Sequence, residues 1–153
     1  GTYLRTIYNN YHKSLDKKFE PLSVFKFQKL LSEKLKDLKI ERKFVYRNLN
    51  ENFSGGEKKK MEILQMSLLQ PSLTMLDEID SGLDIDALKI VCDGIKKIKH
   101  DNKNMGILLV THYQRILRHI KPDKVHVFKN GKIVKSGGSK FAKELEKGGY
   151  EKI

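Results

Sequence analysis

Residues 53–57 read Phe-Ser-Gly-Gly-Glu, and this stretch opens a predicted helix. Ser54 is a favoured N-cap residue, and Glu57 three positions later completes a capping-box pattern. The first turn of a helix exposes backbone amides, and Gly55 and Gly56 let an anion approach them closely, so this helix start is a candidate anion site. Taken alone, the pattern is more typical of a flexible loop followed by an ordinary N-cap. The role of residues 53–57 therefore depends on which motifs accompany them in the chain.

Strands and helices are expected to alternate after this first helix, which should end at Pro71. An apolar run over residues 73–76 ends on two carboxylates, as expected for a buried strand of a parallel sheet. Residues 85–100 carry apolar side chains at helical spacing, and residues 106–111 form a second apolar run. The alternation predicts an α/β fold.

The flanking segments predict further helices and a hairpin. Residues 3–47 are rich in Lys and have apolar side chains at helical spacing, which indicates two or three amphipathic helices broken near Pro21. Towards the other end we expect a short helix over residues 114–120, a hairpin over residues 124–136 and a last helix over residues 140–147. No internal repeat is visible.

The ends of the two predicted strands carry candidate catalytic groups. Asp77 and Glu78 form a pair of carboxylates that would repel each other unless a cation or hydrogen bonds compensate. Asp77 is placed to hold Mg²⁺ through its water shell, and Glu78 to polarise an attacking water. His112 directly follows the second strand, so it is expected at the same edge of the sheet, within reach of a terminal phosphate.

Together these segments resemble the ATP-binding cassette ATPases. Residues 53–57 resemble the signature motif of that family, residues 73–78 its Walker B strand, residues 81–84 its D-loop, and Thr111-His112 its switch histidine. Within the family, the similarity is to SufC-type ATPases of the Suf iron–sulfur cluster assembly system, and it covers about residues 52–146. The signature motif departs from the usual pattern, with Phe and Glu where Leu and Gln are common.

The resemblance implies a P-loop NTPase fold of which the chain holds one part. A phosphate-binding Walker A loop of the form GxxxxGK[ST] does not occur between Gly1 and Ile153. We therefore expect an α-helical subdomain over residues 1–71, which includes the signature motif and its helix, and the C-terminal part of the α/β core over residues 72–153. The isolated chain is expected to be inactive with ATP and to expose an apolar sheet edge, whereas the intact protein should be an ATPase.

The resemblance also implies that ATP and Mg²⁺ are bound between two copies that associate when ATP is present. Asp77, as the Mg²⁺ ligand, and the catalytic residues Glu78 and His112 would face the ATP of their own copy. The residues that would face the partner's ATP are Ser54, Gly55, Gly56, Glu57 and Asp84. A further hypothesis is that one lysine of residues 58–60 pairs with Glu78 in the resting state.

For a SufC-type protein the resemblance implies that ATP hydrolysis drives a conformational change in a SufB/SufD-type scaffold during iron–sulfur cluster assembly. One alternative is the nucleotide-binding subunit of an ABC transporter, although Ile79 stands where most transporter ATPases carry Pro. Another is an SMC-like chromosome-maintenance or DNA-repair ATPase head, whose DNA a basic chain would suit. Against that alternative stand His112, which such heads generally lack, and the absence of long heptad arms.

The composition sets the remaining expectations. The 31 basic and 19 acidic residues give a net charge of +12, but the lysines are spread along the chain with acidic residues between them, so a solvated face is favoured over a nucleic-acid site. The single Cys92 excludes an internal disulfide framework and is expected to be buried. No apolar run reaches the roughly 18 residues of a spanning helix, so no direct membrane insertion is expected. The Lys- and Asn-rich sequence suggests the plastid-like organelle (apicoplast) of an apicomplexan parasite, with bacterial cytoplasm as the alternative.

Overall fold

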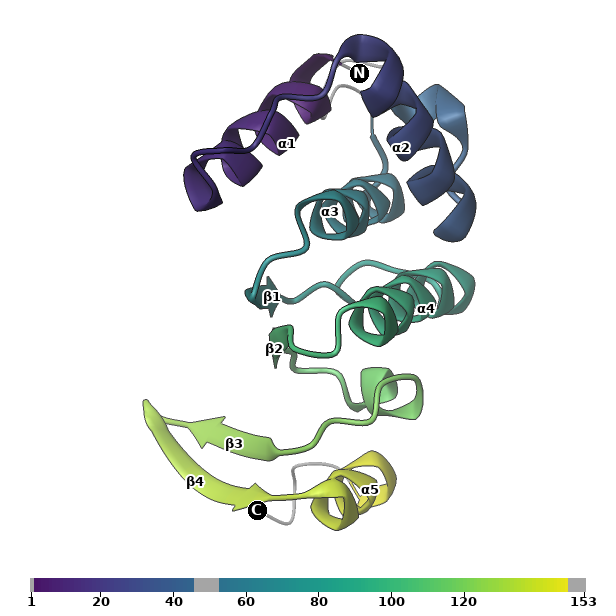
Figure 1. The fold of residues 1–153 in the computed structure, drawn as a ribbon. Coiled ribbons are helices and arrows are strands. Elements are labelled where there is room, and N and C mark those ends of the chain that lie inside the picture. Colours follow the sequence, from purple (N-terminus) through teal and green to yellow (C-terminus); the bar gives the residue numbers. More distant parts are fainter. Residues whose placement is uncertain (1, 46–52, 149–153) are drawn as a thin grey trace.

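The computed structural model describes residues 2–45 and 53–148, and its elements follow one another in space much as they do along the chain (Figure 1). The predicted segments are all present, with bounds close to those expected, except that residues 114–118 form a 3₁₀ helix. In chain order the elements are α1 (Thr2–Leu15), α2 (Val24–Asp37), the 3₁₀ helix η1 (Arg42–Val45), α3 (Gly55–Leu69), β1 (Leu73–Asp77), α4 (Ile85–Asp101), β2 (Gly106–Val110), the 3₁₀ helix η2 (Gln114–Arg118), β3 (Val125–Lys129), β4 (Lys132–Gly137) and α5 (Ser139–Gly148).

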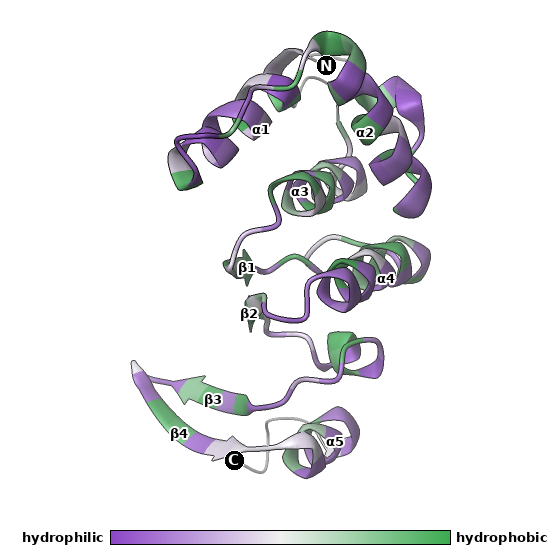
Figure 2. Cartoon of the chain, in the orientation of Figure 1, coloured by the Kyte–Doolittle hydropathy of each residue, from purple (hydrophilic) through white to green (hydrophobic). Residues whose placement is uncertain are grey.

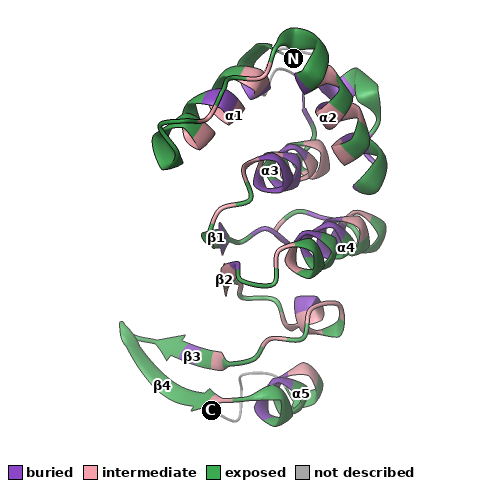
Figure 3. Cartoon of the chain, in the orientation of Figure 1, coloured by how far each residue is buried: buried purple, intermediate pink, exposed green. Residues whose placement is uncertain are grey.

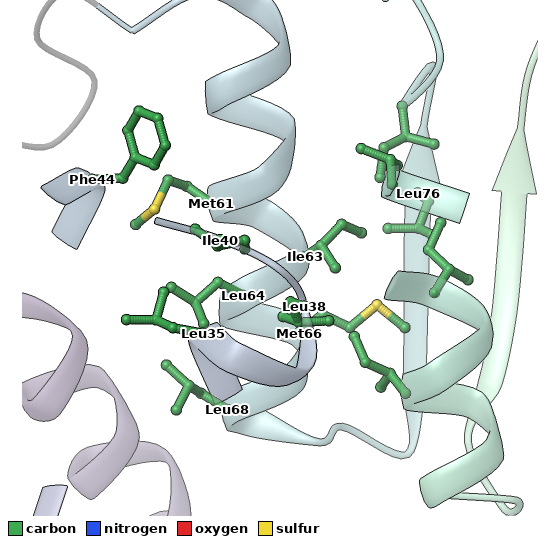
Figure 4. Packing of buried hydrophobic residues seen from close by; sticks show 14 of the residues in the cluster. Leu35, Leu38, Ile40, Phe44, Met61, Ile63, Leu64, Met66, Leu68 and Leu76 are labelled. Carbon is green, nitrogen blue, oxygen red and sulfur yellow. The ribbon is translucent and has the colours of Figure 1, made fainter. Parts of the chain in front are cut away.

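Helix α3 is the centre of the main hydrophobic core. Apolar side chains on several of its faces are buried, which is typical of a helix enclosed by other elements. Leu64 and Leu68 point towards Leu35 of α2, whereas Ile63 lies on the other side of the helix (Figure 4). On that side a Cβ added to Gly94 of α4 would lie 2.8 Å from Ile63 Cγ2, so a glycine is required where α3 and α4 approach each other.

The same core extends across the subdomain boundary that we expected after residue 71. Helix α3 packs against α1 and α2 as well as against α4. The division into residues 1–71 and residues 72–153 therefore stays a prediction. The onset of the family resemblance at residue 52 and the tail after residue 148 lie outside the described residues.

Strands β1 and β2 pair in parallel and in register, from Leu73 opposite Gly106 to Asp77 opposite Val110. This confirms the parallel α/β arrangement, but the expectation that both strands are buried is wrong. Met75 is 72% exposed and Leu108 opposite it 51% exposed, whereas Leu76 points to the core and is 8% exposed. No described element covers the outer face of the strand pair. This face is a different surface from the apolar sheet edge that we expected to be exposed, and that expectation stays a prediction.

The C-terminal part forms a separate small cluster. Strands β3 and β4 are an antiparallel hairpin whose turn residues Asn130 and Gly131 both have positive φ, as two-residue hairpin turns require. Val127 packs with Phe141 and Leu145 of α5. Both strands of the hairpin contain hydrophobic residues (Figure 2), and most of the hairpin is exposed (Figure 3). Among the described helices, none combines the length and apolar character that crossing a membrane requires.

Candidate functional site

The start of α3 is held by the capping box that the sequence predicts. The Ser54 hydroxyl accepts a hydrogen bond from the Glu57 amide at 3.2 Å, and the Glu57 carboxylate accepts one from the Ser54 amide at 2.7 Å. Glu57 thus interacts with its own helix start. A Cβ added to Gly55 would meet nothing within 4 Å, so packing inside the chain does not explain that glycine. The exposed helix start suits an anion that approaches from outside.

The start of α4 lies beside the start of α3. Asp84 caps α4, because its carboxylate accepts a hydrogen bond from the Ala87 amide at 2.7 Å. A Cβ added to Gly56 would lie 3.7 Å from side-chain atoms of both Leu83 and Ala87. The residues expected to face a partner's nucleotide therefore come from two adjacent helix N-termini.

Glu78 and His112 meet at the carboxyl edge of the parallel strands, as predicted. Nδ1 of His112 lies 3.2 Å from Oε1 of Glu78, and both side chains are about half exposed. The Glu78 amide donates to the carbonyl of Val110 at 2.9 Å, which ties the end of β1 to the end of β2. Glu78 has a φ of 46°, a strained value for a residue other than glycine, and the carbonyl of Glu78 accepts from the Ser81 amide at 3.0 Å in the turn that follows.

Asp77 is exposed at the end of β1, opposite Val110 of β2. Within the described parts of the chain, no group of three or more His, Cys, Asp or Glu side chains could hold a metal ion. Mg²⁺ commonly keeps several of its waters and takes one or two carboxylates together with phosphate oxygens of a nucleotide. A single accessible carboxylate such as Asp77 fits that chemistry, and it does not fit a metal held by protein side chains alone.

The lysines after the signature motif do not contact Glu78 in this structure. Lys59 pairs with Glu62 on its own helix at 3.2 Å, and Glu78 contacts His112 instead. The hypothesis of a resting-state pair between Glu78 and one of residues 58–60 in the whole protein therefore stays a prediction. The contact of the Glu78 carboxylate is with His112, at the end of the other strand.

Asp80 is the residue near this site that the sequence did not identify. It is fully buried, and its Oδ2 accepts a hydrogen bond from the Thr111 hydroxyl at 2.8 Å. The only available signal was an acidic residue two positions after Glu78, which in an exposed loop would mean little. Asp80 differs from an acidic residue in an exposed loop because it is buried, and a buried carboxylate is stable only with hydrogen-bond partners. Nearby Cys92 is buried as expected, and burial raises the pKa of its thiol to about 11.

The chain is similar to known proteins over most of its length. The chain is 52% identical over 149 residues to "Probable ATP-dependent transporter ycf16" of Cyanophora paradoxa, covering 97% of this chain and 56% of that protein. It is 52% identical over 131 residues to "Probable ATP-dependent transporter SufC" of Escherichia coli, covering 86% and 52% respectively. The chain thus spans about half the length of these curated relatives. No family model matches it.

The fold has a counterpart among solved structures. The dimeric structure of MJ0796, a bacterial ABC transporter cassette, superposes with a TM-score of 0.68 at 19% identity, over 88% of this chain and 55% of that one. At that identity the likeness concerns the fold. The order of helices and parallel strands described above is therefore that of one part of an ABC transporter cassette.

Proposed function

Since this chain belongs to the ATP-binding cassette family, with SufC and ycf16 proteins as relatives, we propose that the whole protein of which it is part binds and hydrolyses ATP. The observation that carries the proposal is the 3.2 Å contact between Glu78 and His112 at the carboxyl edge of β1 and β2. Ligands of open α/β sheets bind at that edge, so the two side chains lie where phosphates would be placed.

The two strand-end side chains suit different tasks in phosphoryl transfer. The Glu78 carboxylate would orient and polarise the attacking water, and the His112 imidazole would donate a hydrogen bond to the terminal phosphate. Asp77 would hold Mg²⁺ through water, and the ion would supply charge neutralisation at the phosphates. The half exposure of Glu78 and His112 supports these roles, because both side chains remain accessible to a ligand.

We further propose that Ser54, Gly55, Gly56, Glu57 and Asp84 act on the ATP of a second copy. Support comes from the exposed start of α3, from the space around Gly55, and from the adjacent start of α4. The fold is also that of a cassette described as dimeric. Glu57 would contribute indirectly, because its carboxylate fixes the Ser54 amide. ATP would then be the bridge between two copies.

For the partner, we propose a SufB/SufD-type scaffold in which ATP-driven association of two copies changes the scaffold's shape during iron–sulfur cluster assembly. The identity to a protein named SufC supports this choice. A membrane transporter subunit is the second candidate, since the relatives' names include "ATP-dependent transporter". Purifying the whole protein with its bound partners separates the two, because the scaffold would copurify from a soluble extract and transporter subunits only with detergent.

We propose no nucleic-acid partner, because the excess positive charge is spread along the chain and acidic residues interrupt it. For localisation, relatives of similar identity come from algae and from bacteria, which supports a plastid-like organelle or bacterial cytoplasm. The apicoplast of an apicomplexan parasite is the finer proposal. It rests on the Lys- and Asn-rich sequence.

The decisive experiment is steady-state phosphate release by the whole protein with Mg-ATP. We expect turnover that depends on Mg²⁺ and falls by at least about 100-fold in Glu78→Gln, while Glu144→Gln, a change at an exposed position of α5, leaves it intact. Turnover within about ten-fold of wild type in Glu78→Gln would contradict the assignment of the site. Absence of turnover in the wild-type protein, with and without its partner, would contradict the proposed function.

A further inference from the structure

A buried polar cluster lies next to the contact between Glu78 and His112. Asp80, which is fully buried, accepts the hydroxyl hydrogen of Thr111 at its Oδ2, and Arg115 Nη2 donates to the main-chain carbonyl of Asp80 at 2.7 Å. Asp80 Oδ1 and Arg115 Nε are also buried, and neither has a hydrogen-bond partner within the described residues. Burying a carboxylate costs free energy unless hydrogen bonds compensate, so this arrangement calls for an explanation.

The Thr111 hydroxyl connects Asp80 to the backbone of Tyr113, directly after His112. The Tyr113 amide donates to Thr111 Oγ1 at 2.9 Å, which closes a small turn around His112. The hydroxyl has one hydrogen and two acceptors in reach, Asp80 Oδ2 at 2.8 Å and the Tyr113 carbonyl at 3.3 Å, and the shorter contact to a carboxylate is the favoured one. The buried carboxylate thus holds the turn that presents the histidine.

Arg115 is connected to His112 through the ring of Tyr113. Its guanidinium lies 4.9 Å from the centroid of the Tyr113 ring, and the Tyr113 ring lies 3.8 Å from the His112 ring, centroid to centroid. Such cation–π and ring contacts restrict the rotamers of exposed side chains. Two chains of contacts therefore link Asp80 to His112. One runs from its carboxylate through the turn at Thr111, and the other from its main-chain carbonyl through Arg115 and the ring of Tyr113.

We propose that Asp80, acting through Thr111 and Arg115, is a positioning residue that holds the His112 imidazole beside Glu78. The inference rests on the proposed function for its catalytic consequence. The loop after β1 and the loop after β2 would then form one unit, in which the histidine cannot move away from the carboxylate independently. Misplacement of a reacting group by about 1 Å can lower the rate on the order of 100-fold, so loosening this unit should lower the rate measurably.

Thr111 is the best position for a test, because a change at the fully buried Asp80 could unfold the protein. Thr111→Val keeps the shape and removes the hydroxyl, whereas Thr111→Ser keeps the hydroxyl. In the whole protein we expect Thr111→Val to lower kcat by about 10- to 100-fold with little change in KM for ATP. Thr111→Ser should restore most of the rate.

A double-mutant cycle with His112→Ala separates positioning from general damage. If Thr111 acts through the histidine, Thr111→Val should have no further effect on kcat once His112 is Ala. An equal loss in both backgrounds would overturn the inference and show a merely structural role. An unchanged kcat in the single Thr111→Val variant would overturn it too.

A second readout needs no nucleotide and no activity. In the wild-type protein the Tyr113 ring should shift the NMR signals of the His112 imidazole protons upfield, because the two rings are 3.8 Å apart. We expect these shifts to move towards free-histidine values in Thr111→Val and to persist in Thr111→Ser. Identical spectra in all three proteins would overturn the inference even if the protein is an ATPase. The expected shifts in a protein without ATPase activity would support the positioning and contradict only the proposed function.

Discussion

The start of α3 and the ends of β1 and β2 are built in opposite ways. At the start of α3 the interacting residues, Ser54 and Glu57, are three positions apart, and the capping box forms wherever the helix forms. At the strand ends, Asp80 bonds to residues 31 and 35 positions away, so the arrangement exists only after β1 and β2 have paired. The capping box could be recognised in the sequence, whereas the bonds of Asp80 were seen only in the structure.

The two regions also differ in what their polar groups do. The Ser54 and Glu57 side chains are engaged in hydrogen bonds within their own turn, and the helix start as a whole presents backbone amides to the outside. The Glu78 and His112 side chains contact each other and stay half exposed. We therefore expect changes at the strand ends to act on chemistry first, and side-chain changes at the helix start to act on stability as well.

Glu78→Gln should have the largest effect. The amide cannot act as a base for the attacking water, so kcat of the whole protein should fall by about 10²- to 10⁴-fold. Phosphate release under saturating Mg-ATP measures it, and circular dichroism should show an unchanged fold. A residual rate within ten-fold of wild type would mean that the strand-end carboxylate is not the group that acts on water.

His112→Ala should come next. Loss of one hydrogen-bond donor to a developing charge typically lowers kcat by about 10²- to 10³-fold, and KM should change little. His126→Ala is the matched control, because His126 is exposed on the hairpin and bonds only to Ser136 among the described residues. Equal losses in the two variants would remove the distinction between the strand ends and the rest of the surface.

Met75→Ala tests whether the strand pair is covered in the whole protein. The side chain is 72% exposed here, and the curated relatives are nearly twice as long as this chain. If the remainder of the protein packs on this face, the change should cost about 2–5 kcal/mol in the free energy of unfolding, as for a buried methionine. Denaturant unfolding measures it, with Leu15→Ala as a control at an exposed position. A cost below about 0.5 kcal/mol, as at ordinary surface positions, would show that the face stays open.

Ser54→Ala should have the smallest of these effects. Loss of the N-cap hydrogen bond should lower the stability of the whole protein by about 1 kcal/mol, and Ser54→Asp should keep it, because Asp is also a good cap. Thermal unfolding of the three proteins without nucleotide checks this. Equal midpoints for Ser54→Ala and wild type would mean that the capping box contributes nothing to the fold.

Some features of the fold and of the site were predictable from the sequence. The capping box at Ser54 and the turn at Asn130-Gly131 were predictable because their signals are local. The meeting of Glu78 and His112 was predictable because parallel strands deliver their ends to one edge. Asp80 was missed, since nothing in a loop sequence distinguishes a buried carboxylate from a solvated one.

One further expectation failed for a related reason, and another stays open. The runs at β1 and β2 have the composition of buried strands, yet one face is exposed, because burial depends on elements that the run itself does not specify. The lysine pair with Glu78 is not seen in this structure, where Lys59 contacts Glu62 one turn away, and it stays a prediction for the whole protein. Long-range pairing of charges is the part of the site that composition and spacing determine least.

The most direct test of a site shared between two copies is sedimentation velocity of the whole protein carrying Glu78→Gln, which should bind ATP without consuming it. We expect monomers without nucleotide and dimers with Mg-ATP, and we expect Ser54→Arg, placed on the same protein, to prevent the dimer by filling the exposed helix start. A protein that stays monomeric with Mg-ATP, or that dimerises equally with and without the arginine, would contradict the conclusion that the two regions of one chain serve two different nucleotides.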